Sequence, residues 1–170
     1  FRAFVVAGEI TAISQYDDHL MYPFVVGHPG VIVAAITRCC AAAKPILREL
    51  FGNLGVVADF LVVPPGDDGG LWRARIIELN PFGPMTGASL FTWTGDRRLL
   101  QGGQDIYGDL AECKSQSAPG CMCMLEHVQE QEVMGIPFRY LAAHPPNFTR
   151  DHLEAYWEDY VRLTPHAVKE

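Results

Sequence analysis

The sequence predicts an α+β fold in which helices pack on an antiparallel sheet. Three observations support this class. Residues 1–17 alternate as two short strands around a turn, residues 29–51 space their apolar side chains as a helix does, and residues 55–80 resemble two strands joined by a turn-rich loop. An apolar fraction of 49% and a length of 170 residues suit one packed domain.

The overall composition also narrows the class of partner. The formal charge of −7 argues against a nucleic-acid backbone or an anionic membrane surface as the main partner. No run of about 18 uninterrupted apolar residues occurs, and residues 1–10 lack the basic region and cleavage site of a secretory signal. The chain opens inside a strand without a starting Met, so we expect it to begin partway through a larger protein.

The five cysteines are an odd number and include the neighbouring pair Cys39 and Cys40. This usage fits a reducing compartment, and therefore a cytoplasmic location, better than a disulfide framework. An alternative is a zinc ion held by Cys113, Cys121, Cys123 and His127. Their spacing lacks the paired C-x2-C of structural zinc sites, so free thiols are the preferred interpretation.

The first two strands meet at a Gly-containing turn over residues 7–9. Arg2, Phe4 and Val6 share one face of the first strand because side chains alternate along it. Arg2 is therefore either solvated or directed at an anion.

The helix predicted from Pro29 to about Phe51 has an Ala-rich centre and is expected to stop at Gly52. Pro45 lies inside it, so the helix should kink or divide there. Its apolar face is formed by Val33, Ile36, Cys40 and Leu47.

The strands 55–63 and 71–80 should form an antiparallel hairpin with the loop PPGDDGG at its tip. Residues 1–93 then form the core of a single domain, 1–170. Residues 94–148 form a peripheral extension, in which residues 124–142 combine a short helical stretch with an apolar strand. A C-terminal helix is expected over residues 149–163.

Three polar side chains of the hairpin form the candidate site. Glu78 and Asn80 project to the same side of their strand, and Asp59 reaches them if the two strands pair. Two carboxylates at close range repel unless one is protonated or a cation lies between them. Two carboxylates and an amide oxygen are hard ligands that suit Mg²⁺.

A structural interpretation of the same residues remains open. Asp59 could cap a loop, Glu78 could pair with Arg73 or Arg75, and Asn80 could be a turn residue before proline. The sequence contains no P-loop motif, no G-x-S-x-G nucleophile motif and no H-E-x-x-H zinc motif.

The blocks FRAFVVAGEITAISQYD, VVADFLV and IIELNPFGPMTGASLFTW resemble, in order and spacing, the core of the cell division cycle protein 123 family. The resemblance covers Phe1 to Trp93 well and is most specific in the last block. It implies an ATP-grasp fold, of which this chain would be the C-terminal half. The half that carries the adenine pocket and a phosphate-binding lysine would precede it.

The resemblance also implies roles for individual residues. The magnesium ligands of the family fall on Asp59, Glu78 and Asn80, and Arg2 matches an arginine expected to face the phosphates of ATP. Glu78 departs from the usual Asp of the family. Gly87 stands where the family often has an acidic residue.

The resemblance further implies an ATP-binding assembly factor that contacts the gamma subunit of translation initiation factor 2. The acidic charge agrees with a protein partner. One alternative is an ATP-grasp ligase that joins a carboxylate to an amine through an acyl phosphate. Another is a non-catalytic structural subunit of a larger assembly.

Overall fold

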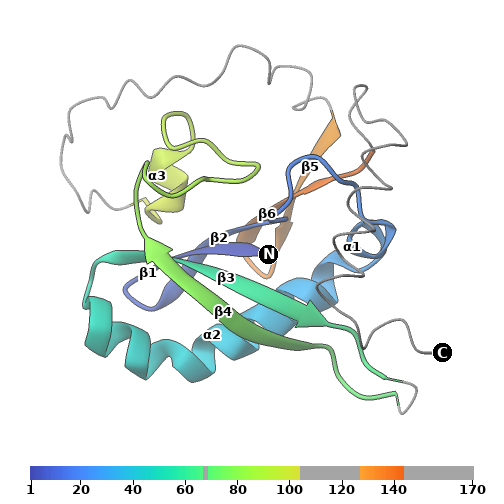
Figure 1. The fold of residues 1–170 in the computed structure, drawn as a ribbon, viewed down its shortest axis with the longest axis horizontal. Coiled ribbons are helices and arrows are strands. Elements are labelled where there is room, and N and C mark those ends of the chain that lie inside the picture. Colours follow the sequence, from blue (N-terminus) through green and yellow to red (C-terminus); the bar gives the residue numbers. More distant parts are fainter. Residues whose placement is uncertain (67–68, 104–126, 144–170) are drawn as a thin grey trace, which may run out of the picture.

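The computed structural model describes residues 1–66, 69–103 and 127–143. The described elements form one six-stranded sheet of order β4-β3-β1-β2-β6-β5 with three helices (Figure 1). Their bounds are β1 Arg2–Val6, β2 Glu9–Ser14, α1 Pro23–Gly27, α2 Pro29–Phe51, β3 Gly55–Val63, β4 Arg73–Pro81, α3 Arg97–Leu100, β5 Val128–Val133 and β6 Ile136–Leu141. Neighbouring strands are antiparallel except β2 and β6, which run parallel. The predicted α+β class with a mainly antiparallel sheet is confirmed.

The predicted Gly-containing turn between β1 and β2 is present, and it is a two-residue loop. Val6 pairs with Glu9, and the two residues between them have positive φ angles, 52° at Ala7 and 77° at Gly8. Two positive φ angles are the signature of the type I′ hairpin turn, whose twist matches that of the strands. The chain direction is therefore reversed within two residues.

The predicted hairpin of β3 and β4 is also present, and it contains a β-bulge. Asp59 lies opposite Glu78, but the next residue of β3, Phe60, lies opposite Ile76. Ile77 is thus the extra residue of the bulge, and its side chain is exposed. A bulge of this kind sharpens the local twist of the strand, here directly beside the candidate site.

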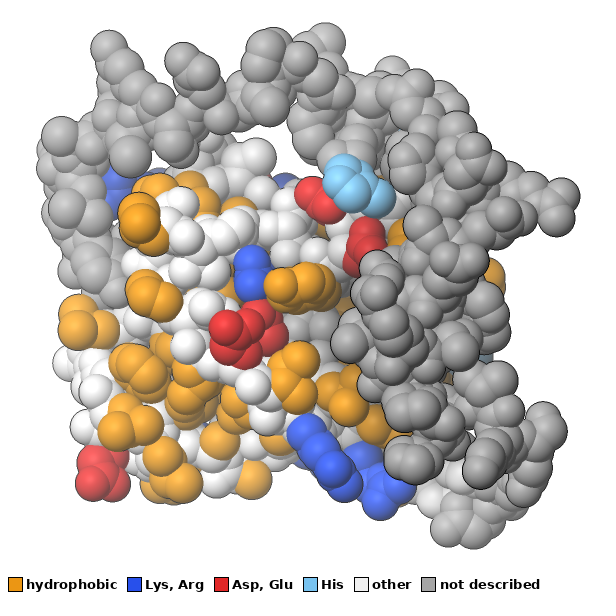
Figure 2. All heavy atoms as spheres, viewed as in Figure 1, with side chains coloured by type: hydrophobic (Ala, Val, Ile, Leu, Met, Phe, Trp, Pro, Cys, Tyr) orange, Lys and Arg blue, Asp and Glu red, His pale blue; other side chains and the backbone are white. Residues whose placement is uncertain are grey.

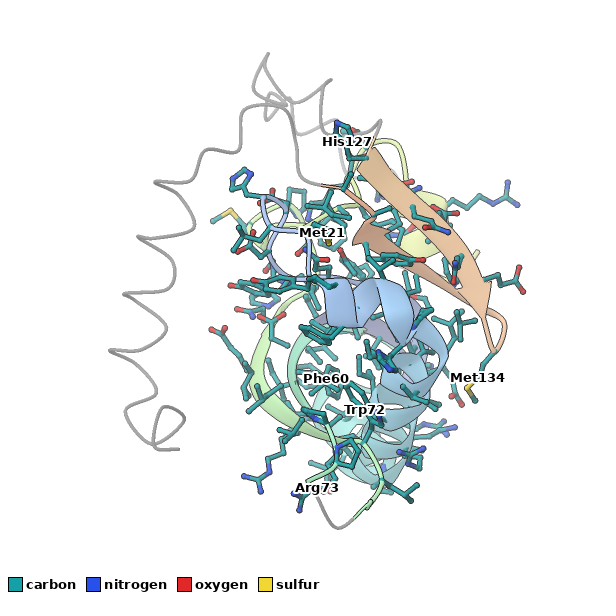
Figure 3. The ribbon with its side chains drawn as sticks, turned by 90° about the vertical axis from the view of Figure 1, so that its right-hand side faces the viewer. Met21, Phe60, Trp72, Arg73, His127 and Met134 are labelled. Atoms are coloured by element: carbon teal, nitrogen blue, oxygen red, sulfur yellow. The ribbon has the colours of Figure 1, made fainter. Side chains whose placement is uncertain are left out.

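Helix α2 covers one face of the sheet. Its inner side packs on Ala3, Val5 and Phe60, and Figure 3 shows Phe60 and Trp72 on the side of the strands that faces the helix. The sequence predicts that the helix either kinks or divides at Pro45. α2 is continuous through this residue, so it does not divide there. Buried residues lie on both sides of this proline, Cys40 before it and Leu47 after it, and they hold both parts of the helix on the sheet.

α2 has 23 residues and is apolar enough to cross a membrane by length and composition alone. The core helix of a globular protein passes the same test. In this structure the buried side chains of α2, among them Ile32 and Ile36, belong to the hydrophobic core that it forms with the sheet.

The opposite face of the sheet is partly covered by residues 82–100, which fold back after β4. Phe4 of β1 meets three rings of this segment edge-on, with centroid distances of 6.2 Å to Phe82, 5.7 Å to Phe91 and 5.5 Å to Trp93. Polar contacts add to the packing, since the amide of Leu90 donates to Ser14 Oγ at 3.1 Å. The turn after Asn80 and Pro81 thus directs the chain back across the sheet, so that residues 82–100 cover part of this face.

The structure tests the prediction for residues 124–142, whereas other predictions for the C-terminal part of the chain lie outside the described residues. The apolar strand expected within residues 124–142 is confirmed as β6. Residues 128–133 form strand β5 and not part of a short helix, because they pair along their length with β6. Met134, at the tip of this hairpin, points away from the sheet (Figure 3). Residues 113, 121 and 123 and the expected helix 149–163 lie outside the described residues.

Candidate metal centre

The sheet brings the predicted site residues together on one face. Asp59, in the middle of β3, pairs with Arg2 of β1 on one side and with Glu78 of β4 on the other. Opposed residues of antiparallel strands point to the same side. All three side chains therefore lie on the face opposite α2, beside the part that residues 82–100 cover.

Arg2 and Asp59 form a buried bidentate ion pair. Arg2 Nε donates to Asp59 Oδ1 and Nη2 donates to Oδ2, both at 2.8 Å. Arg2 is 7% exposed and Asp59 1%. The hydrogen bonds to Asp59 raise the pKa of Arg2 above its ordinary value, although burial acts in the opposite direction. The alternative that Asp59 merely caps a loop is wrong, because it lies inside a strand and pairs with Arg2.

Asn80 and Glu78 complete the group. Asn80 Nδ2 donates to Asp59 Oδ2 at 3.2 Å, so the amide lies within reach of the carboxylate. Glu78 is exposed, and its negative charge also raises the pKa of Arg2. No ion pair joins Glu78 to Arg73 or Arg75, all three of which are among the described residues.

Two further residues enclose Arg2, and neither role was predicted from the sequence. Arg2 Nη1 donates to the carbonyl oxygen of Gly87 at 2.6 Å. The ring of Tyr16 lies over the guanidinium, 4.8 Å from its central carbon. Tyr16 follows β2, where the side-chain amide of Gln15 donates to the carbonyl oxygens of Asp17 and Leu20. Gly87 stands out in the sequence as a departure from the family pattern, but no sequence signal points to Tyr16.

A second arginine, which is only partly buried, lies on the same face. Ser14 pairs with Arg2 on one side and with Arg139 of β6 on the other. Arg139 Nη1 and Nη2 each donate to Asp96 at 2.9 Å, and the guanidinium lies 4.3 Å from the centre of the Phe91 ring. These contacts fix residues 82–100 to the sheet, whereas the Arg2 pair lies at the edge of this segment.

The donor atoms at Asp59 suit a hard cation. Asp59 and Glu78 provide carboxylates, and the Asn80 amide can present its oxygen by turning over. Within residues 1–66, 69–103 and 127–143 no group of three His, Cys, Asp or Glu residues surrounds a possible metal position, so a site here needs the Asn80 oxygen as its third protein ligand. The zinc alternative involves Cys113, Cys121 and Cys123, outside the described residues, and stays a prediction.

The space-filling view places charged groups near the middle of this face. Figure 2 shows acidic side chains directly beside a basic one there, with hydrophobic side chains around them. The structure therefore defines an α+β protein that carries a compact group of carboxylate, amide and guanidinium side chains on one face of its sheet.

Comparison with known proteins identifies the family. The chain matches the family model described as D123 over residues 1–155, and it belongs to the cell division cycle protein 123 family. The match extends well past Trp93, so it includes the whole of the peripheral extension, residues 94–148, and the first residues of the expected C-terminal helix. No curated protein matches the chain.

Proposed function

We propose that this protein binds ATP together with Mg²⁺ and acts as an assembly factor for translation initiation factor 2. The observation that carries the proposal is the convergence of Asp59, Glu78 and Asn80 on one sheet face, with Arg2 beside them. Membership of the cell division cycle protein 123 family supports the same function.

Each residue has a chemical role in this proposal. Asp59, Glu78 and Asn80 would hold Mg²⁺ through their side-chain oxygens. When bound, the cation supplies positive charge that neutralises the phosphate oxygens of the nucleotide. Arg2 offers a planar fork of N–H donors, which matches the geometry of a phosphate group.

The first experiment measures Mg·ATP binding to the full-length protein by calorimetry. Asp59→Asn keeps the shape of the side chain but removes its charge, and Glu78→Gln does the same at the exposed position. We expect each change to weaken binding by about 10-fold or more, since a hard cation loses a charged ligand.

The matched control is Glu132→Gln, an exposed glutamate of β5 at the other edge of the sheet. Its affinity for Mg·ATP should equal that of the wild type. Equal affinity in a folded Asp59→Asn protein would contradict the proposal.

The second experiment concerns the partner. The full-length protein should bind the purified gamma subunit of translation initiation factor 2 directly, as the family resemblance implies. The formal charge of −7 agrees with a protein partner and not with nucleic acid. If sedimentation detects no complex at micromolar concentrations of both proteins, the assembly role is contradicted, whatever the result for ATP.

A further inference from the structure

The bonds of Asp59 leave little room for a cation. Both of its carboxylate oxygens accept a hydrogen bond from Arg2, and Oδ2 also accepts one from Asn80. The carboxylate is 1% exposed, so water does not compete strongly with these donors. These bonds fill three of the roughly four lone-pair sites of the carboxylate, so a metal ion that takes Asp59 as a close ligand competes with the guanidinium of Arg2.

The charges of Arg2, Asp59 and Glu78 also oppose the binding of a metal ion alone. Arg2 and Asp59 neutralise each other, which leaves Glu78 as the one uncompensated charge among these three residues. A divalent ion that enters alone would meet the positive guanidinium at short range and would separate a buried ion pair. Both effects oppose the binding of metal without an accompanying anion.

Arg2 has contacts that can hold it after such a displacement. Its Nη1 donates to Gly87, and Tyr16 stacks on the guanidinium while 54% of the tyrosine remains exposed. Neither contact involves Asp59. A phosphate group that approaches from this side would offer the fork a new bidentate anionic partner in place of Asp59.

From this geometry we infer that Arg2 makes the site selective for a metal–phosphate complex over free metal. With no phosphate present, the guanidinium occupies the oxygens of Asp59. When a phosphate group binds, the guanidinium of Arg2 donates its hydrogen bonds to the phosphate instead of to Asp59, and the oxygens of Asp59 become available to the cation. The inference rests on the proposed binding of Mg·ATP and specifies the order of preference among ligands of that site.

The test uses Mn²⁺ as a spectroscopic substitute for Mg²⁺, with free Mn²⁺ measured by electron paramagnetic resonance in the full-length protein. For the wild type we expect weak binding of Mn²⁺ alone and binding about 10-fold tighter or more when ATP is added, a typical size for coupling between ligands. In Arg2→Met we expect Mn²⁺ alone to bind about 10-fold tighter than in the wild type, and the effect of ATP to shrink.

Arg139→Met is the matched control. It removes a partly buried arginine that pairs with a carboxylate on the same face but does not touch Asp59. Its affinity for Mn²⁺ should not change. If Arg2→Met does not fold, Arg2→Lys keeps the charge and loses the fork, and it should raise the affinity for Mn²⁺ alone by about 3-fold, between the two other proteins.

A measurement on the wild type needs no substitution. The Nε–Hε resonance of Arg2 in the nitrogen-15 spectrum should keep its position in Mg²⁺ alone and shift when ATP is added with Mg²⁺. A shift of the same size in Mg²⁺ alone would overturn the inference, as would a folded Arg2→Met protein that binds Mn²⁺ no tighter than the wild type. A wild type that binds no Mn·ATP would instead overturn the proposed function itself, and with it this inference.

Discussion

Gly55, the first residue of β3, has a ring directly against its backbone. A Cβ atom at this position would lie 2.5 Å from two ring carbons of Phe82, and Phe82 is itself packed against Phe4 and Trp93. Gly55→Ala should therefore lower the free energy of unfolding by about 2 kcal/mol through overpacking. Urea denaturation followed by circular dichroism measures this change.

Gly83→Ala provides the control for this prediction. Gly83 lies in the same segment as Phe82, but a Cβ atom there would have no neighbour within 4 Å. Its free energy of unfolding should stay within about 0.5 kcal/mol of the wild type. Equal stability of the two variants would show that Phe82 moves without cost, contrary to the packing described here.

The positions of some residues of the site could be predicted from the sequence, and those of others could not. Alternation and hairpin pairing are local, so they were enough to bring Glu78 and Asn80 to Asp59. The partner of Arg2 was not predictable in this way, because its pairing with Asp59 joins residues 57 positions apart. The contacts of Tyr16 and Gly87 depend on loops and carry no periodic signal.

At the level of elements, the β1–β2 turn contains a residue in an unfavourable conformation. Ala7 has a φ angle of 52°, which glycine adopts without steric cost. Ala7→Gly should raise the free energy of unfolding by about 0.5 kcal/mol. The same substitution at the exposed helical position Ala41 should lower it by about 1 kcal/mol. A destabilised Ala7→Gly protein would contradict the turn geometry.

The segment 82–100 should respond to acid through Asp96. Burial alone would raise the pKa of Asp96, but hydrogen bonds from Arg139 and Thr92 outweigh burial and lower it below the ordinary value. A carboxylate with a lowered pKa in the folded state stabilises the fold above its unfolded pKa, and this contribution is lost as the pH falls through the folded pKa. The free energy of unfolding should therefore decrease below about pH 4.

Asp96→Asn tests the source of this acid sensitivity. The variant should be less stable than the wild type at neutral pH, and the difference should shrink as the pH falls from about 4 towards 2. Thermal unfolding across this range measures both proteins. A difference that does not vary with pH would exclude Asp96 as the titrating group.

The elements themselves were predicted best where the signal lies within one segment. The two N-terminal hairpins and α2 follow from alternation, turn residues and helical spacing. The bulge at Ile77 was missed because it depends on how β3 and β4 twist against each other. β5 was missed because its sequence, VQEQEV, is polar enough to suit a helix, and pairing with β6 decides its conformation.

At the scale of the whole molecule, α2 and the sheet enclose the larger of the two hydrophobic clusters formed by the described residues. Ile36 is 0% exposed inside this layer, whereas Ile46 on the same helix is 60% exposed. Ile36→Ala should lower the free energy of unfolding by about 3 kcal/mol, and Ile46→Ala should change it by less than about 0.5 kcal/mol. Chemical denaturation distinguishes the two. Equal effects would mean that α2 does not dock on the sheet through this side.

The order of the strands in the sheet could not be predicted from the sequence, because it depends on pairings between segments that are distant along the chain. The hairpin sequences predict which strands are antiparallel neighbours, but not that β1 lies between β3 and β2 or that β6 joins β2 in parallel. Such choices follow from the packing of the whole core. The expectation of an ATP-grasp fold rests on the family resemblance and not on these pairings.

The parallel pairing of β2 with β6 has a consequence for the order of folding. It brings Ile13 against Phe138 and Ser14 against Arg139, whereas strands β1 to β4 all lie within residues 2–81. Closing the longer loop costs more chain entropy, so the four-stranded part should form before the β5–β6 hairpin attaches. The same hairpin should detach first in the native protein. Its amide protons would then exchange with solvent through a partial opening that leaves the pairing of β1 with β3, and hence Arg2 with Asp59, in place.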